Sequence, residues 1–411
     1  MKGKYPTLSL QERDRRWRLV REMMKDQGFD CLIVAGLKGR EMYEGYLTNE
    51  CIEGIVVFPV EEEPIYLTWG EHRIMRRLES TLEKAEFWVK DIRAGANGPG
   101  IVEGLQEKGL DQAKIGVVGL ESKGPGEMEG IIPYKTWSYV LEKLPKATFV
   151  DVSEAFSELK LIKSEEEMAL LRRSAEIGEL ACDTMMKITK PGVRENEIYA
   201  AIMNTIHSHG AFSPAPHLIL VTGPNNITWG PPIWAYWGGN PRVVQEGDLV
   251  LAEIFPCYGG IESQQQMTVA LNPVSPLTKE CAEVSRLSYE AGLNALRPGA
   301  TFQAVCDAME LPIAEAGLWH LTPLIHSLSP LIWVSAIYVG IEQLPGIQKF
   351  KSIKKSPPWG REMYIKPGMA FELEPNACKA KHRVNIGGTV VVTEDGVEEL
   401  NKLPTQMRVI D

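Results

Sequence analysis

The chain has 411 residues, of which 54 are acidic and 44 basic, and its net charge is -10. A length of this order allows two or three domains with a large core, while the negative charge, the lack of a basic tract and the lack of a long apolar run argue against a nucleic-acid or membrane partner. The N-terminus has no apolar signal core and the seven cysteines are scattered without a CxxC pair, so we expect a cytoplasmic protein without disulfides or structural zinc.

The first third of the chain alternates helical and strand patterns. A charged amphipathic helix is predicted over 11–26, and the segment 154–163 is predicted to be a connection. The strands and helices expected between them are strands near 29–35, 54–59, 63–68, 114–120 and 148–152, and helices near 71–82, 100–108 and 133–143. This pattern predicts an α/β domain over residues 1–155.

The remainder of the chain, residues 160–411, looks like two copies of one unit. Each copy begins with a pair of helices that meet at a Pro-Gly junction and continues into apolar strands. The predicted helices are 164–188 and 195–208 in the first copy, and 276–296 and 301–316 in the second. The predicted strands are 216–222, 248–255 and 266–271, followed by 369–374 and 388–393. Duplicated half-domains of this kind predict a shared curved antiparallel sheet with covering helices.

The repeat places a glutamate at the same point of each copy. Glu253 ends the strand that follows Gly247, and Glu374 ends the strand that follows Gly368. Two carboxylates on one sheet face repel each other unless a metal ion, a cationic ligand or a proton lies between them. The repeat therefore predicts a functional site where the two copies meet.

Several separated motifs resemble one known family. They are the segment 161–167, the two Pro-Gly junctions, Gly247-Asp248, the segment 367–375 and the C-terminal stretch 393–404. In this order they are similar to the creatinase, prolidase and aminopeptidase P family. That resemblance implies an α/β N-terminal domain followed by an α+β pita-bread domain, with a small-molecule substrate and a homodimer.

The metal-ligand set of the family is incomplete in this chain. The metal-dependent members hold two ions with Asp, Asp, His, Glu and Glu, and those positions correspond here to Glu253, Gln264, His326, Glu374 and Gly387. A pair of divalent ions needs bridging carboxylates to offset their mutual repulsion. We therefore expect no dinuclear centre and no cofactor, and the alternative is a single divalent metal at Glu253, His326 and Glu374.

Creatinase is the family member that works without metal, and the segment 247–268 and the pair His326-Ser327 resemble it. Gln266 and Met267 depart from its pattern, so creatine is an improbable substrate. The leading hypothesis is a hydrolase that cleaves a C–N bond in a small polar non-peptide substrate. In it, His326 transfers the proton, Glu374 and Glu253 bind the cationic or amide portion, and Gln264 and Gln266, which alternate along one strand, orient the substrate.

Two further groups are candidates for substrate binding. Trp229, in an aromatic loop that continues to residue 237, could form a wall over the pocket with Trp333, and the alternative is loop packing or a dimer contact. His382 and Arg383 could bind a substrate carboxylate, and the alternative is a surface pair. The competing interpretation of His326 is a hydrogen-bonded core histidine, and that of the two glutamates is a salt bridge to Arg383.

Three functions stay open at this point. The first is the C–N hydrolase. The second is a metal-dependent Xaa-Pro dipeptidase or, because of the aromatic loop, a lyase that acts on an onium substrate. The third is a pita-bread binding protein without catalysis, which the missing ligands would suit.

Overall fold

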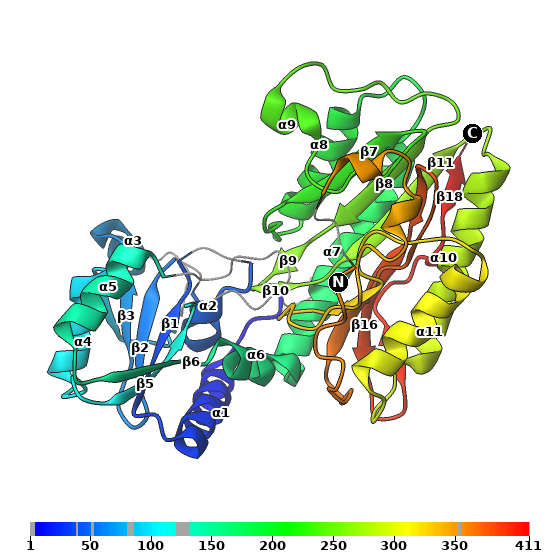
Figure 1. Cartoon of the computed structure of the whole chain (residues 1–411). Helices are drawn as coiled ribbons and strands as arrows, with labels where there is room; N and C mark the ends of the chain where they lie inside the picture. Colours follow the sequence, from blue (N-terminus) through cyan, green and yellow to red (C-terminus); the bar gives the residue numbers. More distant parts are fainter. Residues whose placement is uncertain are drawn as a thin grey trace. The chain divides into compact units, whose positions relative to one another are not determined.

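The computed structural model describes residues 5–37, 40–50, 53–79, 86–120, 132–351 and 355–410. The chain divides into two compact units, Met1–Lys160 and Leu161–Asp411. Both are drawn in Figure 1. The fold class expected from the sequence, an α/β domain followed by a pita-bread domain, is confirmed.

The first unit contains a six-stranded mixed sheet in the order β4-β3-β2-β1-β5-β6. Its strands are β1 (Cys31–Ala35), β2 (Ile55–Pro59), β3 (Ile65–Thr68), β4 (Asp91–Ala94), β5 (Lys114–Val118) and β6 (Thr148–Asp151). Its helices are α1 (Leu10–Gln27), α2 (Tyr43–Thr48), α3 (Glu71–Leu78), α4 (Gly98–Glu107), α5 (Tyr134–Lys143) and α6 (Ser153–Leu161). Apolar residues cover both faces of this sheet and form two separate buried clusters, which is the two-layered core expected of an α/β unit.

The segment expected to be a connection, 154–163, is mostly helix α6. Phe156 and Leu161 lie on its buried side, and the Ser157 hydroxyl donates to the Ser153 carbonyl at 2.7 Å, one turn back. The boundary between the two units, at Lys160 and Leu161, falls inside this predicted connection. Its helix was not expected, because nine residues give too few turns for an apolar period to stand out.

The second unit is built from two helix pairs and one long sheet. The helices are α7 (Glu165–Ile188), α8 (Glu195–Ser208), α9 (Ile233–Trp237), α10 (Pro276–Ala295) and α11 (Phe302–Glu315). The sheet runs in the order β12-β13-β16-β11-β8-β7, with β17 beside β16 and β18 beside β11. Its strands are β7 (Leu218–Gly223), β8 (Leu249–Ile254), β11 (Gln265–Leu271), β12 (Ile325–Ser327), β13 (Ala370–Leu373), β16 (Gly387–Val392), β17 (Val397–Glu399) and β18 (Arg408–Ile410).

The order of the strands reflects the duplication seen in the sequence. Strands β7, β8 and β11 come from the first copy, and β12, β13 and β16 occupy the mirrored places in the second. The two copies meet where β11 pairs with β16, and Gln266 is opposite Gly387 there. The helices α7 and α8 pack against each other in one half, and α10 and α11 do so in the other (Figure 1).

Alternation along the strands gives the sheet one apolar and one polar face. On β8, Val250, Ala252 and Ile254 belong to the cluster that includes α7 and α8. On β13, Phe371 and Leu373 belong to the cluster that includes α10 and α11. The intervening side chains, Glu253 and Glu372 among them, therefore point to the face that the helices do not cover.

Short elements complete the second unit. Two hairpins are β9 (Cys257–Tyr258) with β10 (Ile261–Glu262), and β14 (Asn376–Lys379) with β15 (His382–Asn385). Two 3-10 turns are η1 (Ile341–Gln343) and η2 (Ile347–Lys349). The hairpin β14–β15 follows Glu374 directly, returns the chain to β16 and packs against α10, where the Ser285 hydroxyl bonds to the backbone of both of its strands.

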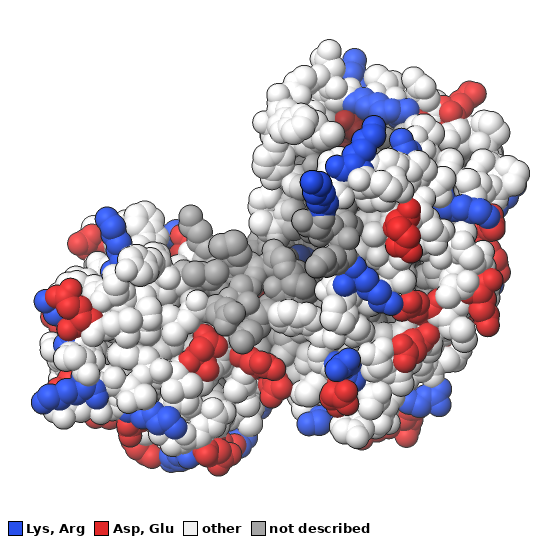
Figure 2. Space-filling model, viewed as in Figure 1, with Lys and Arg blue, Asp and Glu red and all other residues white. Residues whose placement is uncertain are grey.

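Helix α7 begins at a capping box, which explains the acidic start of the second unit. The Ser164 hydroxyl accepts a hydrogen bond from the Glu167 amide, and the Glu167 carboxylate accepts one from the Ser164 amide. No helix in the described ranges is long and apolar enough to cross a membrane. Figure 2 shows Lys and Arg side chains lying among Asp and Glu side chains on the face in view.

Candidate functional site

One row of the polar face crosses the join between the two copies. Glu253 on β8 is the register partner of Gln266 on β11, and Gln266 is the partner of Gly387 on β16. Because Leu373 pairs with Gly388, the next residue, Glu374, lies beside Gly387. The two glutamates singled out by the repeat therefore lie in one row, with Gln266 and a glycine between them.

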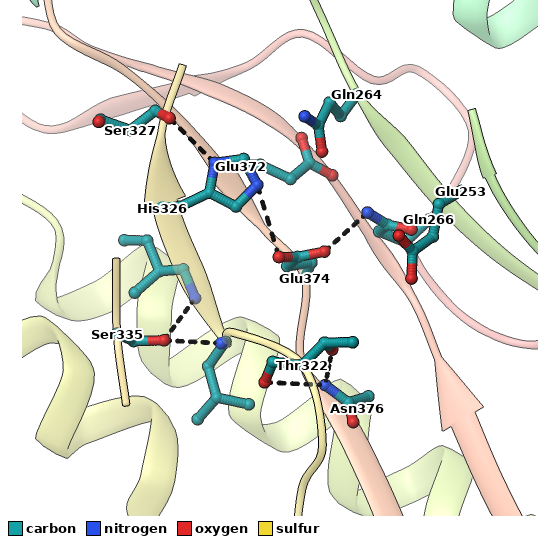
Figure 3. A network of polar contacts seen from close by, with 12 residues as sticks. Glu253, Gln264, Gln266, Thr322, His326, Ser327, Ser335, Glu372, Glu374 and Asn376 are labelled. Atoms are coloured by element: carbon teal, nitrogen blue, oxygen red, sulfur yellow. Dashed lines mark hydrogen bonds and ion pairs between the residues drawn. The ribbon is translucent and has the colours of Figure 1, made fainter. Parts of the chain in front are cut away.

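A second row lies next to the first. His326 on β12 pairs with Glu372 on β13, and Glu372 pairs with Thr389 on β16. Paired residues project to the same side of a sheet, so these three side chains face the same space as Glu374. Figure 3 shows the carboxylates, the imidazole and the glutamine amides converging there from neighbouring strands.

Glu374 is the centre of the contacts. Its Oε1 lies 3.4 Å from His326 Nε2, and its Oε2 accepts a hydrogen bond of 2.8 Å from Gln266 Nε2. The other ring nitrogen, His326 Nδ1, lies 2.9 Å from the Ser327 carbonyl oxygen. A carbonyl oxygen only accepts, so Nδ1 carries a hydrogen. The Nε2–Oε1 contact then holds a proton, because two facing lone pairs would repel.

Glu253 is held by nitrogen donors at the other end of the row. Its Oε2 accepts a 3.0 Å hydrogen bond from Trp229 Nε1, and its Oε1 accepts one of 3.2 Å from Asn385 Nδ2. The same Asn385 nitrogen lies 3.3 Å from Gln266 Oε1. Glu253, Gln266 and Glu374 are thus joined through side-chain amides, and all three are buried.

Glu372 is fully buried, and its pKa lies well above the ordinary value of a glutamate. Burial is the largest cause, and the nearby carboxylates of Glu374, Glu262 and Glu253 raise the pKa of Glu372 further. A hydrogen bond with the Thr389 hydroxyl acts in the opposite direction and does not offset these effects. These effects favour the neutral, protonated form of the Glu372 carboxyl group.

The contacts of Thr389 agree with a protonated Glu372. The Thr389 Oγ1 lies 3.0 Å from the Gln264 carbonyl oxygen and 3.1 Å from Glu372 Oε2, and both are acceptors when Glu372 is ionised. A hydroxyl has only one hydrogen to donate. If Glu372 carries the proton, it donates to Thr389, and Thr389 donates to Gln264. The second oxygen, Glu372 Oε1, is buried without a partner in the described part of the chain.

Position 387 has no space for a side chain. A Cβ atom there would lie 2.4 Å from the Leu373 carbonyl oxygen and 2.8 Å from both Gln266 Cγ and Glu374 Cα. The missing side chain lets Gln266 reach across to Glu374. Where the family has a carboxylate, this chain therefore has a direct hydrogen bond between the two copies, from Gln266 to Glu374.

Gln264 also lies in this cluster, beside Glu372 (Figure 3). Its side-chain nitrogen donates a 2.7 Å hydrogen bond to Glu262 Oε1 on β10. Gln264 and Gln266 are both buried and lie on the same face. Each neutral amide thus donates a hydrogen bond to a carboxylate: Gln264 donates to Glu262, and Gln266 donates to Glu374.

The remaining predicted residues are dispersed. Trp333 packs with Phe302 and Phe371 in the cluster under the helices, on the opposite face from Glu372, so its placement does not support a wall formed with Trp229. His382 lies on β15 next to Arg383 and therefore points to the other side of that hairpin. The fold therefore places neither Trp333 nor His382 next to the glutamates.

Arg383 is buried and not on the surface, contrary to the alternative of a surface pair. It forms no salt bridge with a glutamate in the described residues, contrary to the other alternative, and its Nη2 donates to the Thr228 carbonyl at 3.3 Å. Thr228 precedes Trp229, which contacts Glu253. One loop therefore touches both Arg383 and the row of glutamates.

Sequence reasoning missed four polar residues of the site, Glu262, Glu372, Asn385 and Thr389. The signal for Glu372 was present, because it lies two residues before Glu374 on one strand and must share its face. Asn385 has the same relation to Gly387. Neither was expected, because the repeat in the sequence marks only Glu253 and Glu374.

The donors of the cluster bear on metal binding. Among the described residues, no group of three or more His, Cys, Asp and Glu side chains is arranged to hold a metal ion. His326, Glu374 and Glu253 are the residues that would hold a single divalent ion, but N–H groups of Trp229 and Asn385 already donate to Glu253, and Gln266 donates to Glu374. Each of these bonds uses one lone pair of a carboxylate oxygen, so an ion would have to bind at the lone pairs that remain.

The chain is similar in sequence and fold to several known proteins. The chain is 23% identical over 281 residues to the Xaa-Pro dipeptidase of Pyrococcus furiosus, which covers 68% of this chain and 74% of that one. It is 23% identical over 420 residues to the creatinase of a Bacillus species, covering 97% of this chain and 92% of that one. Among solved structures, the X-Pro aminopeptidase of Thermotoga maritima matches with a TM-score of 0.74 at 16% identity, over 96% of this chain and 99% of that one.

The prolidase of Pyrococcus horikoshii matches with a TM-score of 0.72 at 18% identity, over 94% of this chain and 98% of that one. At such identities the structural matches show a shared fold. The model of metallopeptidase family M24 matches residues 169–394, more than half of the chain, and it spans both copies and every glutamate of the cluster. The chain therefore belongs to metallopeptidase family M24.

Proposed function

We propose that this member of the M24 hydrolase family cleaves a C–N bond in a small polar non-peptide substrate without a dinuclear metal centre. The observation that carries the proposal is the contact of His326 with Glu374 beside the buried Glu372, whose pKa is raised. Hydrolysis must take a proton from the attacking water and give one to the departing nitrogen. A buried imidazole and two carboxyl groups in different protonation states supply both kinds of group.

The roles follow from the contacts. His326 and Glu374 share a proton between Nε2 and Oε1, and a remaining lone pair of the Glu374 carboxylate would accept the proton of the attacking water as its oxygen bonds to the carbon. Glu372, as a carboxylic acid, would give the leaving nitrogen the proton that its Oε2 shares with Thr389 as the C–N bond breaks. Glu253 would bind the cationic or N–H-bearing part of the substrate, and Gln264 and Gln266 would orient it.

The donor set supports a site that does not depend on two metal ions. The position of the last family glutamate is Gly387, where a side chain would collide with backbone. The position of the second aspartate is Gln264, whose amide supplies one neutral oxygen and already donates to Glu262. No step is assigned to a metal here, and a single divalent ion at Glu253, His326 and Glu374 is the alternative.

A metal-dependent Xaa-Pro dipeptidase is the second candidate, because two relatives that match this chain over 74% and 78% of their own length have the name Xaa-Pro dipeptidase. The two candidates differ in what removes activity. A dipeptidase of this type should release proline only when loaded with metal. The small-molecule substrate, the homodimer and the cytoplasmic location also belong to the proposal.

The test compares turnover with and without a chelator, using amidino, ureido and cyclic-amidine compounds alongside an Xaa-Pro dipeptide. We expect a C–N compound to be hydrolysed at the same rate after chelation. His326→Gln should lower that rate by about 10²–10⁴-fold, because glutamine cannot transfer the proton. Metal analysis of the same protein, purified without chelators, should find fewer than two equivalents.

His320→Gln is the matched control. His320 is also a buried histidine of the second unit, and burial lowers its pKa to about 4. Its replacement by glutamine therefore exchanges one neutral side chain for another. Its Nδ1 faces the Thr322 carbonyl at 3.2 Å and not the glutamates. Equal losses in the two variants would show a structural effect only. Binding of a compound without product would favour a protein that binds but does not catalyse.

A further inference from the structure

Arg383 is a buried cation with unused hydrogen-bond donors. Its exposed fraction is 0%, and only Nη2 has a partner, the Thr228 carbonyl at 3.3 Å. Its Nε and Nη1 are buried and have no partner among the described residues. Arginine stays charged in proteins, and a buried charge without a counter-charge is costly. The guanidinium therefore needs an anion that the described residues do not provide.

The position of Arg383 connects it to the row of glutamates. On strand β15, Arg383 and Asn385 project to the same side and their Cα atoms are about 7 Å apart. Asn385 contacts Glu253 and Gln266 through Nδ2, and its Oδ1 is buried without a partner in the part of the chain that the structure describes. The unused donors of Arg383 thus adjoin the far end of the site, beyond Glu253.

The loop before α9 covers both groups. Thr228 contacts Arg383, and Trp229 contacts Glu253. Thr228 also lines an open cavity of about 320 Å³, whose other walls include Ile227, Leu344 and Lys381. In the same loop, both polar atoms of the buried Asn226 side chain lack a partner within the described ranges. The loop itself and the Arg383 side chain that it contacts thus both have unpaired buried polar atoms, which a bound ligand would satisfy.

We propose that Arg383 binds the carboxylate of the substrate, so that the substrate is a zwitterion. Its cationic or N–H-bearing end lies against Glu253 and Glu374, and its carboxylate lies on the guanidinium of Arg383. This deepens the proposed function, on which the identity of the bound molecule as a substrate depends. Arginine and a carboxylate form two parallel hydrogen bonds through Nη2 together with either Nε or Nη1. Nη2 has two hydrogens, so one remains for such a pair beside the bond to the Thr228 carbonyl, and either Nε or Nη1 supplies the second donor.

The test uses pairs of probes that differ only in the carboxylate. One pair is 4-guanidinobutanoate and its neutral amide, and equivalent pairs carry ureido and cyclic-amidine groups, with acetate and inorganic phosphate as simple anions. Binding is measured by calorimetry and by thermal shift. We expect each acid that binds to bind about tenfold to hundredfold more tightly than its amide, because charge-assisted hydrogen bonds are lost in the amide.

Arg383→Met should abolish this preference, and Arg383→Lys should retain part of it, because lysine keeps the charge without the paired donors. Arg383→Met without ligand should unfold at or above the temperature of the unsubstituted protein, since a buried unpaired charge is removed. A purely structural arginine would give a lower temperature. Lys381→Met removes an exposed cation that lines the cavity and should leave the preference intact.

The proposal is overturned if Arg383→Met keeps the preference, if Lys381→Met loses it instead, or if no carboxylate, acetate included, stabilises the unsubstituted protein more than Arg383→Met. A preference for phosphate over every carboxylate would also overturn it. Different outcomes would contradict the proposed hydrolysis. Carboxylate selectivity without any product would count against hydrolysis alone, and turnover that is independent of Arg383 would count against this inference alone.

Discussion

Glu372→Gln is expected to remove turnover while the protein becomes more stable at neutral pH. Glutamine has nearly the shape of a neutral glutamic acid, but it cannot give up a proton to a leaving group. General acid catalysis typically contributes about 10²–10⁴-fold, so we expect a loss of that order in the hydrolysis rate. The rate is measured with whichever amidino, ureido or cyclic-amidine compound the unsubstituted protein turns over.

The gain in stability follows from the raised pKa of Glu372. In the folded chain the pKa of Glu372 lies above 4.5, its ordinary value in the unfolded chain, so the folded state binds the extra proton. The stability that goes with this proton is fully present below pH 4.5 and falls as the pH rises toward the folded-state pKa, by at most about 1.4 kcal/mol per pH unit. Glutamine does not ionise and escapes this loss.

Thermal unfolding at pH 5 and pH 8 therefore checks the protonation state without any substrate. The variant should exceed the unsubstituted protein by more at pH 8 than at pH 5. A variant that is less stable at both values would mean that Glu372 is ionised in the folded protein and that its carboxylate holds the strands together. That result would contradict both the neutral acid and its role as proton donor.

Glu179→Gln is the matched control. Glu179 lies on α7 in the same unit, half-buried, and burial raises its pKa too. Its carboxylate accepts a 2.8 Å hydrogen bond from the Leu403 amide, which the glutamine oxygen can still accept. We expect a change in stability of the same sign and unchanged turnover. Loss of turnover in both variants would attribute the effect to packing of the unit.

The sequence predicted the frame of the fold because the frame depends on local patterns. The Ser164 cap, the two Pro-Gly junctions and the apolar strands after Gly247 and Gly368 each describe a few neighbouring residues. Their repetition indicated two copies, and the paired arrangement of β8 and β13 follows from it. The short hairpin β14–β15 was missed because four-residue strands with few apolar residues give no clear period.

The site was harder to predict, since its chemistry depends on contacts between distant residues. Glu374 and His326 could be selected from the sequence, but the proton between them depends on which way the imidazole faces. The neutral state of Glu372 results from burial and from three carboxylates that lie on other strands or two residues away. The burial of Arg383 depends on a loop more than 150 residues earlier in the chain, as does its contact with Thr228.

Gly387→Ala is expected to destabilise the second unit by about 3 kcal/mol, and Gly387→Glu by more. A Cβ at this position would lie 2.4 Å from a backbone oxygen, so the strands β13 and β16 must separate to admit it. For a unit of this size the loss corresponds to a Tm lower by about 6–12 °C. The glutamate variant adds a carboxylate next to Glu374 in a buried setting, which increases the cost.

Gly396→Ala and Gly396→Glu are the matched controls, because a Cβ at Gly396 meets no atom within 4 Å. Both should leave the Tm within about 1–2 °C of the unsubstituted protein, as for surface substitutions in general. Equal effects at the two positions would mean that the contact with the Leu373 carbonyl is relieved at little cost. The space at position 387 would then not limit the side chain that it can carry.

The same substitution separates two explanations for the incomplete metal set. If only charge were missing, the double variant Gln264→Asp with Gly387→Glu would regain the family's carboxylates and bind two divalent ions. If instead the strands leave no space at position 387, the added carboxylate cannot point toward a metal ion, because the Gln266 side chain already lies between β11 and Glu374. We expect the second result, with fewer than two equivalents of Mn, Zn or Fe in metal analysis. Two equivalents bound at an unchanged Tm would show instead that the site keeps room for a metal pair, and the case for metal-independent hydrolysis would then rest on His326 and Glu372 alone.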